Sequence, residues 1–431
     1  MKPISFVHCS DLHLGCQQYN EPQRWQDFGQ AFAHIAEYAI DHSVNYLLIG
    51  GDLFHQRNIN AQTLEQAIVV LKKLKEARIR TVAIEGNHDK AFYLEGQSWM
   101  DFLNDEGFIY LLKPEIAEGK LVLSPYNGQR GCVMEDEGLR IIGLGYLGAT
   151  TRQRLEEVSE DIRPSDSFTI MLLHAAVDKL MGQDMAGVSS KVLEKLEGTV
   201  DYLALGHIHS RQELNEYIFN PGAPEAVHID EARSQRQKGF YHVIINGKEK
   251  TVRFIESKRR NIYYIDINLH GLSSPSEVIP KITQELDAQA ADIQEKSMIQ
   301  IMLYGEVDFH SYAIDTTDIS NIIKQKYECL VVDIINNTNL PEISDDSSYD
   351  RFDRVSIERS VIRKMIEQEK PEYKDAADTI VNLILKVKEL SAVDSKPEDI
   401  IALLENATED MILSGNEAAA AGEYRKGVKK G

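Results

Sequence analysis

Short apolar runs alternate with longer amphipathic segments through the first 257 residues. The runs at 4–7, 44–49 and 81–84 predict buried strands, and 25–42 and 60–77 carry apolar side chains at helical spacing. Further strands are predicted at 120–123, 140–144, 168–173 and 202–205, and 239–245 with 252–255 predicts a hairpin that turns at Asn246-Gly247. This alternation predicts βαβ units around a parallel or mixed sheet that is covered on both faces.

The pattern changes near residue 257. Three strand-like runs at 263–267, 298–303 and 330–335 are separated by helical patterns at 275–291 and 317–326, which predicts a compact β-α-β-α-β module. An acidic stretch then leads into helical segments at 355–368 and 373–390, with a weaker one at 398–404. The predicted organisation is therefore a first domain at 1–257, a module at 258–338, a linker at 339–353, a helical pair at 354–405 and a flexible tail at 406–431.

The helical pair has one apolar face and no core of its own. It docks either on the chain's own globular part or on a separate partner protein, and the sequence leaves both open. The apolar candidates for such a contact are Ile357, Val361, Met365, Ile380 and Ile384.

Composition narrows the classes of function. The chain has 431 residues, 43% of them apolar, and a net charge of −21, which argues against a protein that simply coats nucleic acid. DNA remains possible as a substrate, since divalent metals would supply positive charge at an active site. Residues 233–260 contain nine Lys and Arg, against two acidic residues, Glu249 and Glu256. This basic stretch is either a nucleic-acid contact or an ordinary solvated run of charges.

Location is predicted from what the sequence lacks. No apolar stretch approaches the ~20 residues of a membrane span. Met1 leads directly into a strand-like run, so no signal peptide is expected and the cytoplasm is predicted. The four cysteines form no Cys-x-x-Cys pair and are interpreted as reduced thiols.

Metal-ligand side chains follow five of the predicted strands. In chain order these motifs are Asp11-Leu12-His13, Gly50-Gly51-Asp52-Leu53-Phe54-His55, Gly86-Asn87-His88-Asp89, His174, and Gly206-His207-Ile208-His209. A polar turn would account for any one of them, but not for five in order at strand ends, where open α/β sheets bind ligands. Carboxylates and imidazoles suit manganese, iron or zinc, and one carboxylate can bridge two ions. The motifs therefore predict a dimetal site.

This series resembles the calcineurin-like metallophosphoesterase superfamily over about residues 1–257. The resemblance implies an α/β (α+β) fold, with a β-sandwich of mixed sheets flanked by helices and the metals at strand ends. It implies that one ion is held by Asp11, His13, Asp52 and His209, and the second by Asp52, Asn87, His174 and His207. His88 would be the catalytic histidine, and His55 would either position the phosphodiester or be a structural residue of its loop.

Within the superfamily, three features resemble the DNA double-strand-break repair nucleases of the meiotic-recombination-eleven and SbcD family, in its prokaryotic type. The first is the pair of segments around Asp11 and Asp52. The second is Asn220-Pro221-Gly222-Ala223-Pro224-Glu225, which is similar to the family's Pro-Gly-Ser-x-Glu stretch but carries Ala223 in place of Ser. The third is the layout, since the module at 258–338 resembles a DNA-capping domain and the helical pair a helix-loop-helix that binds the ATPase partner.

The resemblance implies a function with defined cofactors and partners. It implies a manganese-dependent 3′–5′ exonuclease and endonuclease with two Mn²⁺, or alternatively Fe or Zn, that acts on double-strand ends, hairpins and single strands. It also implies a homodimer, candidate contact residues for which are Leu64, Leu71, Trp99, Phe102 and Leu103, unless these pack on their own sheet. The further partner would be an SMC-like ABC ATPase of the SbcC type, in the nucleoid. Candidate phosphate contacts are Arg57, Lys90, Arg233, Arg236, Lys258, Arg259 and Arg260.

Two other functions stay open from the sequence. The chain could be a general metallophosphoesterase that acts on small phosphodiesters or phosphoproteins. It could also be mainly a subunit that tethers DNA ends and regulates the ATPase, with nuclease activity secondary. Cleavage of duplex DNA would argue against the general metallophosphoesterase. If DNA binding and repair survived replacement of His88, tethering would be the main task.

Overall fold

The computed structural model divides into two compact units, Met1–Pro341 and Glu342–Gly431. It describes residues 3–91, 96–136, 138–178, 188, 190–234, 237–289 and 293–340, and in the second unit 359, 362–363, 365–366, 373, 376–392, 401 and 403–404. Each unit is considered by itself.

The first sheet has the order β14-β13-β1-β2-β3-β4. Its parallel part is β1 (Ile4–Cys9), β2 (Tyr46–Ile49), β3 (Arg80–Ala83) and β4 (Tyr110–Leu111). The hairpin of β13 (Gly239–Asn246) and β14 (Glu249–Glu256) adds to β1 in antiparallel register, with Phe6 opposite Val243. The sheet is therefore mixed, as predicted.

The second sheet has the order β11-β12-β10-β9-β8-β7. Its parallel strands are β8 (Leu139–Gly145), β9 (Phe168–His174), β10 (Tyr202–Gly206) and β12 (Ile218–Asn220). The antiparallel edges are β7 (Val133–Asp136) and β11 (Gln212–Leu214). A small hairpin of β5 (Glu115–Ala117) and β6 (Lys120–Val122) lies outside both sheets.

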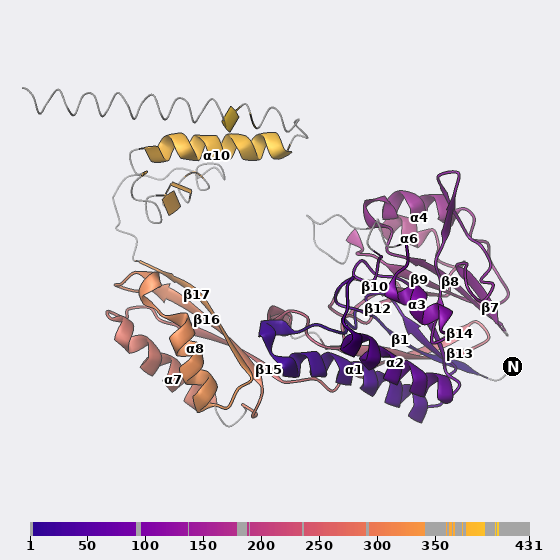
Figure 1. The fold of residues 1–431 in the computed structure, drawn as a ribbon, viewed down its shortest axis with the longest axis horizontal. Coiled ribbons are helices and arrows are strands. Elements are labelled where there is room, and N and C mark those ends of the chain that lie inside the picture. Colours follow the sequence, from indigo (N-terminus) through magenta and orange to yellow (C-terminus); the bar gives the residue numbers. More distant parts are fainter. Residues whose placement is uncertain are drawn as a thin grey trace, which may run out of the picture. The chain divides into compact units, whose positions relative to one another are not determined.

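The two sheets pack face to face, with helices outside. The layer between them buries Phe6, Leu48 and Val82 of the first sheet with Leu172 and Tyr202 of the second. On the outer face of the first sheet lie α1 (Pro22–Asp41), α2 (Ala61–Glu76) and α3 (Trp99–Asp105), and on that of the second α4 (Thr151–Ser159) and α6 (Ser190–Glu194) (Figure 1). This is an α/β fold with mixed sheets flanked by helices.

Local sequence explains where the helices begin. Pro22 starts α1 at a position where its missing N–H costs nothing. The Asn60 side chain accepts a hydrogen bond from the Thr63 amide at the start of α2. Ser98 and Asp101 form a capping box at the start of α3. Short 3-10 helices occur at η1 (Gln18–Asn20), η2 (Gly148–Thr150), η3 (Ile229–Ser234), η4 (Pro275–Glu277) and η6 (Ser311–Ala313).

The rest of the first unit is a parallel three-stranded sheet of β15 (Ile262–Asn268), β16 (Met298–Glu306) and β17 (Val331–Asn339). The helices α7 (Val278–Gln289) and α8 (Thr316–Lys326) supply its core, in which Leu286 and Ile323 pack against Ile301. Its elements follow the predicted β-α-β-α-β order.

In the second unit the structure describes α10 (Ala377–Ala392), where 373–390 was predicted helical. Most of the predicted helix 355–368, the linker from 341 onward and the tail 406–431 lie outside the described residues. Among the helices that are described, none is both long enough and apolar enough to span a bilayer.

Candidate metal centre

All the predicted ligands lie at the carboxyl ends of strands from both sheets. Asp11 and His13 follow β1, Asp52 follows β2 and Asn87 follows β3. His174 is the last residue of β9, and His207 and His209 follow β10. Because the sandwich brings these ends together, the chain gathers ligand atoms that are up to about 200 positions apart in sequence.

The backbone at the site is held in an uncommon conformation. Asp11, His13, Asp52 and His207 have φ angles of 54°, 48°, 52° and 95°. Non-glycine residues in this left-handed region are sparse and are retained mainly at functional sites. A Cβ added at Gly86 would overlap the Asp52 side chain and backbone nitrogen, so glycine is required where the two loops cross.

The side chains form two neighbouring clusters. Asp11, His13 and His209 form the first, in which all ligand atoms lie within 4.8 Å of one another and the two Nε2 atoms are 3.1 Å apart. Asp52, His174 and His207 form the second. The Asn87 amide oxygen lies 3.2 Å from His174 Nε2 and 3.0 Å from His207 Nδ1, so Asn87 joins this cluster.

The distance between Asp52 and His174 places Asp52 in the second cluster. Its carboxylate lies 3.2 Å from His174 Nε2. The predicted bridging role of Asp52 between two ions stays a prediction.

Hydrogen bonds outside the clusters set which nitrogen of each ring is available. His174 Nδ1 lies 2.8 Å from the Gly50 carbonyl and His209 Nδ1 lies 2.8 Å from Glu231 Oε1. Both acceptors require a proton on Nδ1, so in the neutral form of each ring Nε2 is the nitrogen whose lone pair can bind a metal. Partners of this kind fix the tautomer and orientation of metal-binding histidines.

The electrostatics of the clusters fit cations. Asp11 and Asp52 are buried, and neither has a Lys or Arg ion pair among the residues described. Buried anions need a compensating charge. Burial lowers the pKa of His174, but the Asp52 and Asp11 carboxylates and the Gly50 carbonyl together raise it to about 9, so in the protein alone a proton on His174 supplies that charge. Oxygen and imidazole donors around two buried carboxylates therefore fit two divalent metal ions.

Two further histidines border the first cluster. His88 Nδ1 donates to the His55 carbonyl at 2.6 Å, and the His88 amide donates to Asp52 Oδ1 at 2.8 Å. The His55 ring stacks on the His88 ring, and His55 Nδ1 lies 3.4 Å from His13 Nδ1. Nε2 of His88 is thus the nitrogen free for proton transfer beside the clusters.

The sequence profile described as calcineurin-like phosphoesterase matches residues 4–211, the stretch that supplies all these ligands. Residues 4–211 therefore form a calcineurin-like metallophosphoesterase domain. Its aspartate and histidine clusters are of the type that holds two metals in this family.

The chain is also similar to curated proteins named DNA double-strand break repair protein Mre11. It is 26% identical to that of Archaeoglobus fulgidus over an alignment of 361 positions that covers 75% of this chain and 78% of the relative. It is 26% identical to that of Sulfurisphaera tokodaii, over 71% of this chain and 75% of the relative. It is 27% identical to that of Methanocaldococcus jannaschii, over 65% and 73%. The chain is therefore an Mre11-like metallophosphoesterase.

The predicted phosphate contacts of this metallophosphoesterase are scattered. Arg57 is exposed beside the clusters, where its Nη2 lies 3.4 Å from the Asn87 carbonyl. Lys90 lies 3.8 Å from Glu85. Lys258 is exposed and Arg259 half-buried. The Arg233 side chain and all of Arg236 lie outside the described part of the chain.

Arg260 makes ion pairs and hydrogen bonds within the first unit. Its guanidinium makes a bidentate pair with Asp27, with both bonds at 2.6–2.7 Å, and donates to the Lys296 carbonyl at 2.6 Å. Asp27 also pairs with the buried Arg24, which reaches Glu225 at 3.2 Å. Arg260 therefore links these segments of the first unit, and its predicted contact with DNA stays a prediction.

Two of the predicted dimer contacts are wrong. Leu71 and Leu103 are fully buried in the core of their own domain, while Leu64 and Trp99 pack partly against it. Phe102 is 38% exposed and remains a candidate. An amphipathic helix buries its wider apolar face on its own sheet, and the sequence pattern does not separate the two faces.

The candidate partner contacts lie in the second unit. Met365 and Ile384 are exposed and Ile380 is half-buried, whereas Ile357 and Val361 fall outside the described residues.

Several residues around the clusters have roles that were not predicted. Asp89 is buried and accepts backbone hydrogen bonds from Leu53, Phe54 and Gly86, and burial followed by the Asp52 charge raises its pKa to about 7. It ties the Asp52 loop to the Gly86 loop. The Tyr146 ring packs on His174 and His207. Glu231 orients His209, and no local motif marked it.

Proposed function

We propose that the chain is a manganese-dependent DNA nuclease, with 3′–5′ exonuclease and endonuclease activity, that processes and tethers double-strand-break ends. One observation carries the proposal, namely the convergence of seven Asp, Asn and His side chains into two adjoining clusters in a chain similar to Mre11 proteins. Neither the clusters nor the similarity alone would select a DNA substrate.

In this proposal, Asp11, His13, Asp52 and His209 hold one ion, and Asp52, Asn87, His174 and His207 hold the other. Two bound divalent ions neutralise the phosphodiester and lower the pKa of a water molecule, so that hydroxide is present near neutral pH. Manganese is preferred for the mixed oxygen and imidazole donors, with iron or zinc as alternatives.

Side chains and backbone groups of the chain would position the substrate and the proton donor. The His55 carbonyl holds the His88 ring through Nδ1–H, so that Nε2 faces the clusters and, when the ring carries its second proton, can give that proton to the leaving oxygen. The amide of His88 holds Asp52 through Oδ1, which fixes one carboxylate oxygen. His55 and the exposed Arg57 would contact the phosphate oxygens next to the scissile bond.

The module at 258–338 would act as a DNA-capping domain, and Lys258 with Arg259 would contact phosphates. The exposed Met365 and Ile384 support a helix-loop-helix that binds an SMC-like ABC ATPase. Binding of that ATPase by wild type but not by Ile384→Asp would test this contact.

A homodimer would form through α2 and α3. Val69 and Phe102 expose apolar surface on these helices, which supports the assignment. Sedimentation velocity of Phe102→Asp beside wild type tests it, and an unchanged dimer in the variant would contradict it.

Cleavage of linear duplex DNA tests the function as a whole. We expect cleavage with Mn²⁺ and none with a chelator, at a rate higher than that of bis-p-nitrophenyl phosphate at equal concentration. Rapid hydrolysis of the small diester with duplex DNA left intact would instead identify a general phosphodiesterase.

A further inference from the structure

A histidine outside the predicted metal motifs lies buried between the two sheets. His8 is on β1, three residues before Asp11, and its side chain is fully buried. Its Nε2 lies 3.1 Å from the Leu205 carbonyl oxygen on β10, and its Nδ1 lies 3.0 Å from the Tyr202 hydroxyl of the same strand. His8 therefore joins a strand of the first sheet to a strand of the second.

The hydrogen bonds fix the protonation of the His8 ring. A backbone carbonyl can only accept, so Nε2 carries a proton and donates it to Leu205. Burial lowers the pKa of His8 to about 3, and the Leu205 carbonyl raises it only in part, so the ring is neutral near pH 7. The neutral ring accepts at Nδ1, to which the Tyr202 hydroxyl donates. Both ring nitrogens have partners, as a polar side chain buried in an apolar layer requires.

The two sheets come into close contact next to this link. A Cβ on Gly50 would lie 3.1 Å from the Leu205 carbonyl oxygen, and a Cβ on Gly206 would overlap the Ser10 hydroxyl and the Gly50 carbonyl. Glycine at both positions permits this approach of the two backbones. The bond from His8 to Leu205 therefore lies where the spacing between the sheets is most restricted by the backbone itself.

The first cluster takes its three residues from these same two strands. Asp11 and His13 follow β1 and His209 follows β10, whereas the residues of the second cluster follow β2, β9 and β10. The Asp11 carboxylate also accepts from the His207 amide at 3.0 and 3.1 Å, so the chain is held across the sheets beyond the strands as well. The distance between β1 and β10 at this end therefore sets how far Asp11 and His13 lie from His209.

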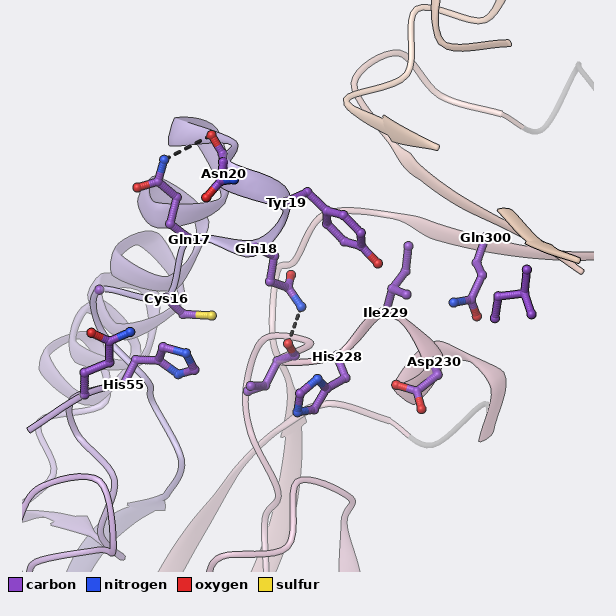
Figure 2. Close-up of a pocket in the computed structure, with 14 residues that line it drawn as sticks. Cys16, Gln17, Gln18, Tyr19, Asn20, His55, His228, Ile229, Asp230 and Gln300 are labelled. Carbon is purple, nitrogen blue, oxygen red and sulfur yellow. Dashed lines mark hydrogen bonds between the residues drawn. The ribbon is translucent and has the colours of Figure 1, made fainter. Parts of the chain in front are cut away.

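We propose that His8 is a positioning residue for the first metal ion, because its bond to Leu205 fixes the spacing of β1 and β10. The inference rests on the proposed two-metal centre and adds to it a residue that touches neither the metals nor the substrate. The cavity beside the first cluster has His55 and His228 in its wall (Figure 2), and His8 and Leu205 lie outside that wall. A change at His8 would thus reach the centre only through the two strands.

Two conservative variants separate the two hydrogen bonds of His8. The amide of Gln reaches the place of Nε2 and can still donate to Leu205, whereas the amide of Asn reaches only the place of Nδ1 and keeps the contact with Tyr202. Calorimetric titration of the full chain with Mn²⁺ should show two sites in wild type. In His8→Asn we expect one of them to weaken about tenfold, the lower end of the range for loss of an outer partner. In His8→Gln both should stay within about threefold of wild type.

Ile141→Ala is the matched control, because it loosens the same layer on β8, a strand that no predicted ligand follows. It should lower the free energy of unfolding, measured without metal, at least as much as His8→Asn does, yet leave both Mn²⁺ affinities unchanged. Wild-type affinities in His8→Asn would overturn the role of His8, as would an equal loss in His8→Gln or in Ile141→Ala. Fewer than two Mn²⁺ sites in wild type would be a different result, which contradicts the proposed two-metal centre itself.

Discussion

His209 Nδ1 donates a 2.8 Å hydrogen bond to Glu231 Oε1, and the second oxygen of Glu231 accepts from the buried Lys238. Lys238 also donates to the His209 carbonyl at 2.8 Å, so the three side chains form a closed unit. Backbone amides of Val227 and His228 point at the same carboxylate. Glu231 is therefore positioned to fix the tautomer of a predicted metal ligand from outside the metal site.

Removal of this carboxylate should weaken metal binding. Glu231→Ala is expected to lower Mn²⁺ affinity about 10- to 100-fold, the usual effect of losing an outer hydrogen-bond partner. Glu231→Gln keeps an acceptor and should lose less. Mn²⁺ affinity is measured by calorimetry, and the exposed Glu249→Ala on β14 is the matched control. If Glu231→Ala bound Mn²⁺ as tightly as the control, the orienting role would be wrong.

Metal binding should release a proton at neutral pH. Burial lowers the pKa of His174, but Asp52, Asp11 and the Gly50 carbonyl together raise it to about 9, so His174 is protonated at pH 7.5 in the metal-free protein. A metal needs the neutral Nε2, so binding must displace that proton. The enthalpy of Mn²⁺ binding should therefore depend on the ionisation enthalpy of the buffer at pH 7.5, corresponding to about one proton or more. The release from His174 should diminish above about pH 9. Buffer-independent enthalpies at pH 7.5 would contradict this.

The buried pairs around Asp27 should matter for stability. Asp27→Ala leaves Arg24 and Arg260 without their shared carboxylate, and breaking a buried pair in this way typically costs about 3–5 kcal/mol. The free energy of unfolding in urea, measured without metal, gives the loss. Glu285→Ala removes a surface pair with Lys281 on α7 and should cost only about 0.3–0.5 kcal/mol. If the two variants lost similar amounts of unfolding free energy, the pairs of Asp27 with Arg24 and Arg260 would contribute no more to stability than a surface pair.

Residues with a strong local signal could be predicted from the sequence. The apolar runs that end in Asp11, Asp52, Asn87, His174 and His207 gave the strands and the candidate ligands together, because a strand's end and its polar residues are adjacent in the chain. The apolar spacing over 60–77 predicted α2, and Asn246-Gly247 predicted the turn of the hairpin, because this residue pair favours such a turn.

Features that depend on three-dimensional proximity could not be predicted in this way. Glu231 is 22 residues after His209, beside a run of basic residues, and nothing in its neighbours indicates its partner. Arg260 was grouped with the exposed basic residues because its carboxylate partner, Asp27, is 233 positions away in the sequence. Leu71 and Leu103 have the same apolar character whether a helix buries them or presents them to a second chain.

The most direct test of the proposed dimetal nuclease compares wild type with His88→Ser in Mn²⁺-dependent cleavage of linear duplex DNA. We expect a fall of about 10²- to 10⁴-fold in cleavage, the range for loss of a general acid, with Mn²⁺ affinity within about threefold of wild type. His270→Ser replaces an exposed histidine of the first unit and should cleave normally. DNA binding and repair that survived in His88→Ser would make end tethering the main task. Cleavage that persisted at the wild-type rate would contradict the proposed role of His88 and the dimetal nuclease built around it.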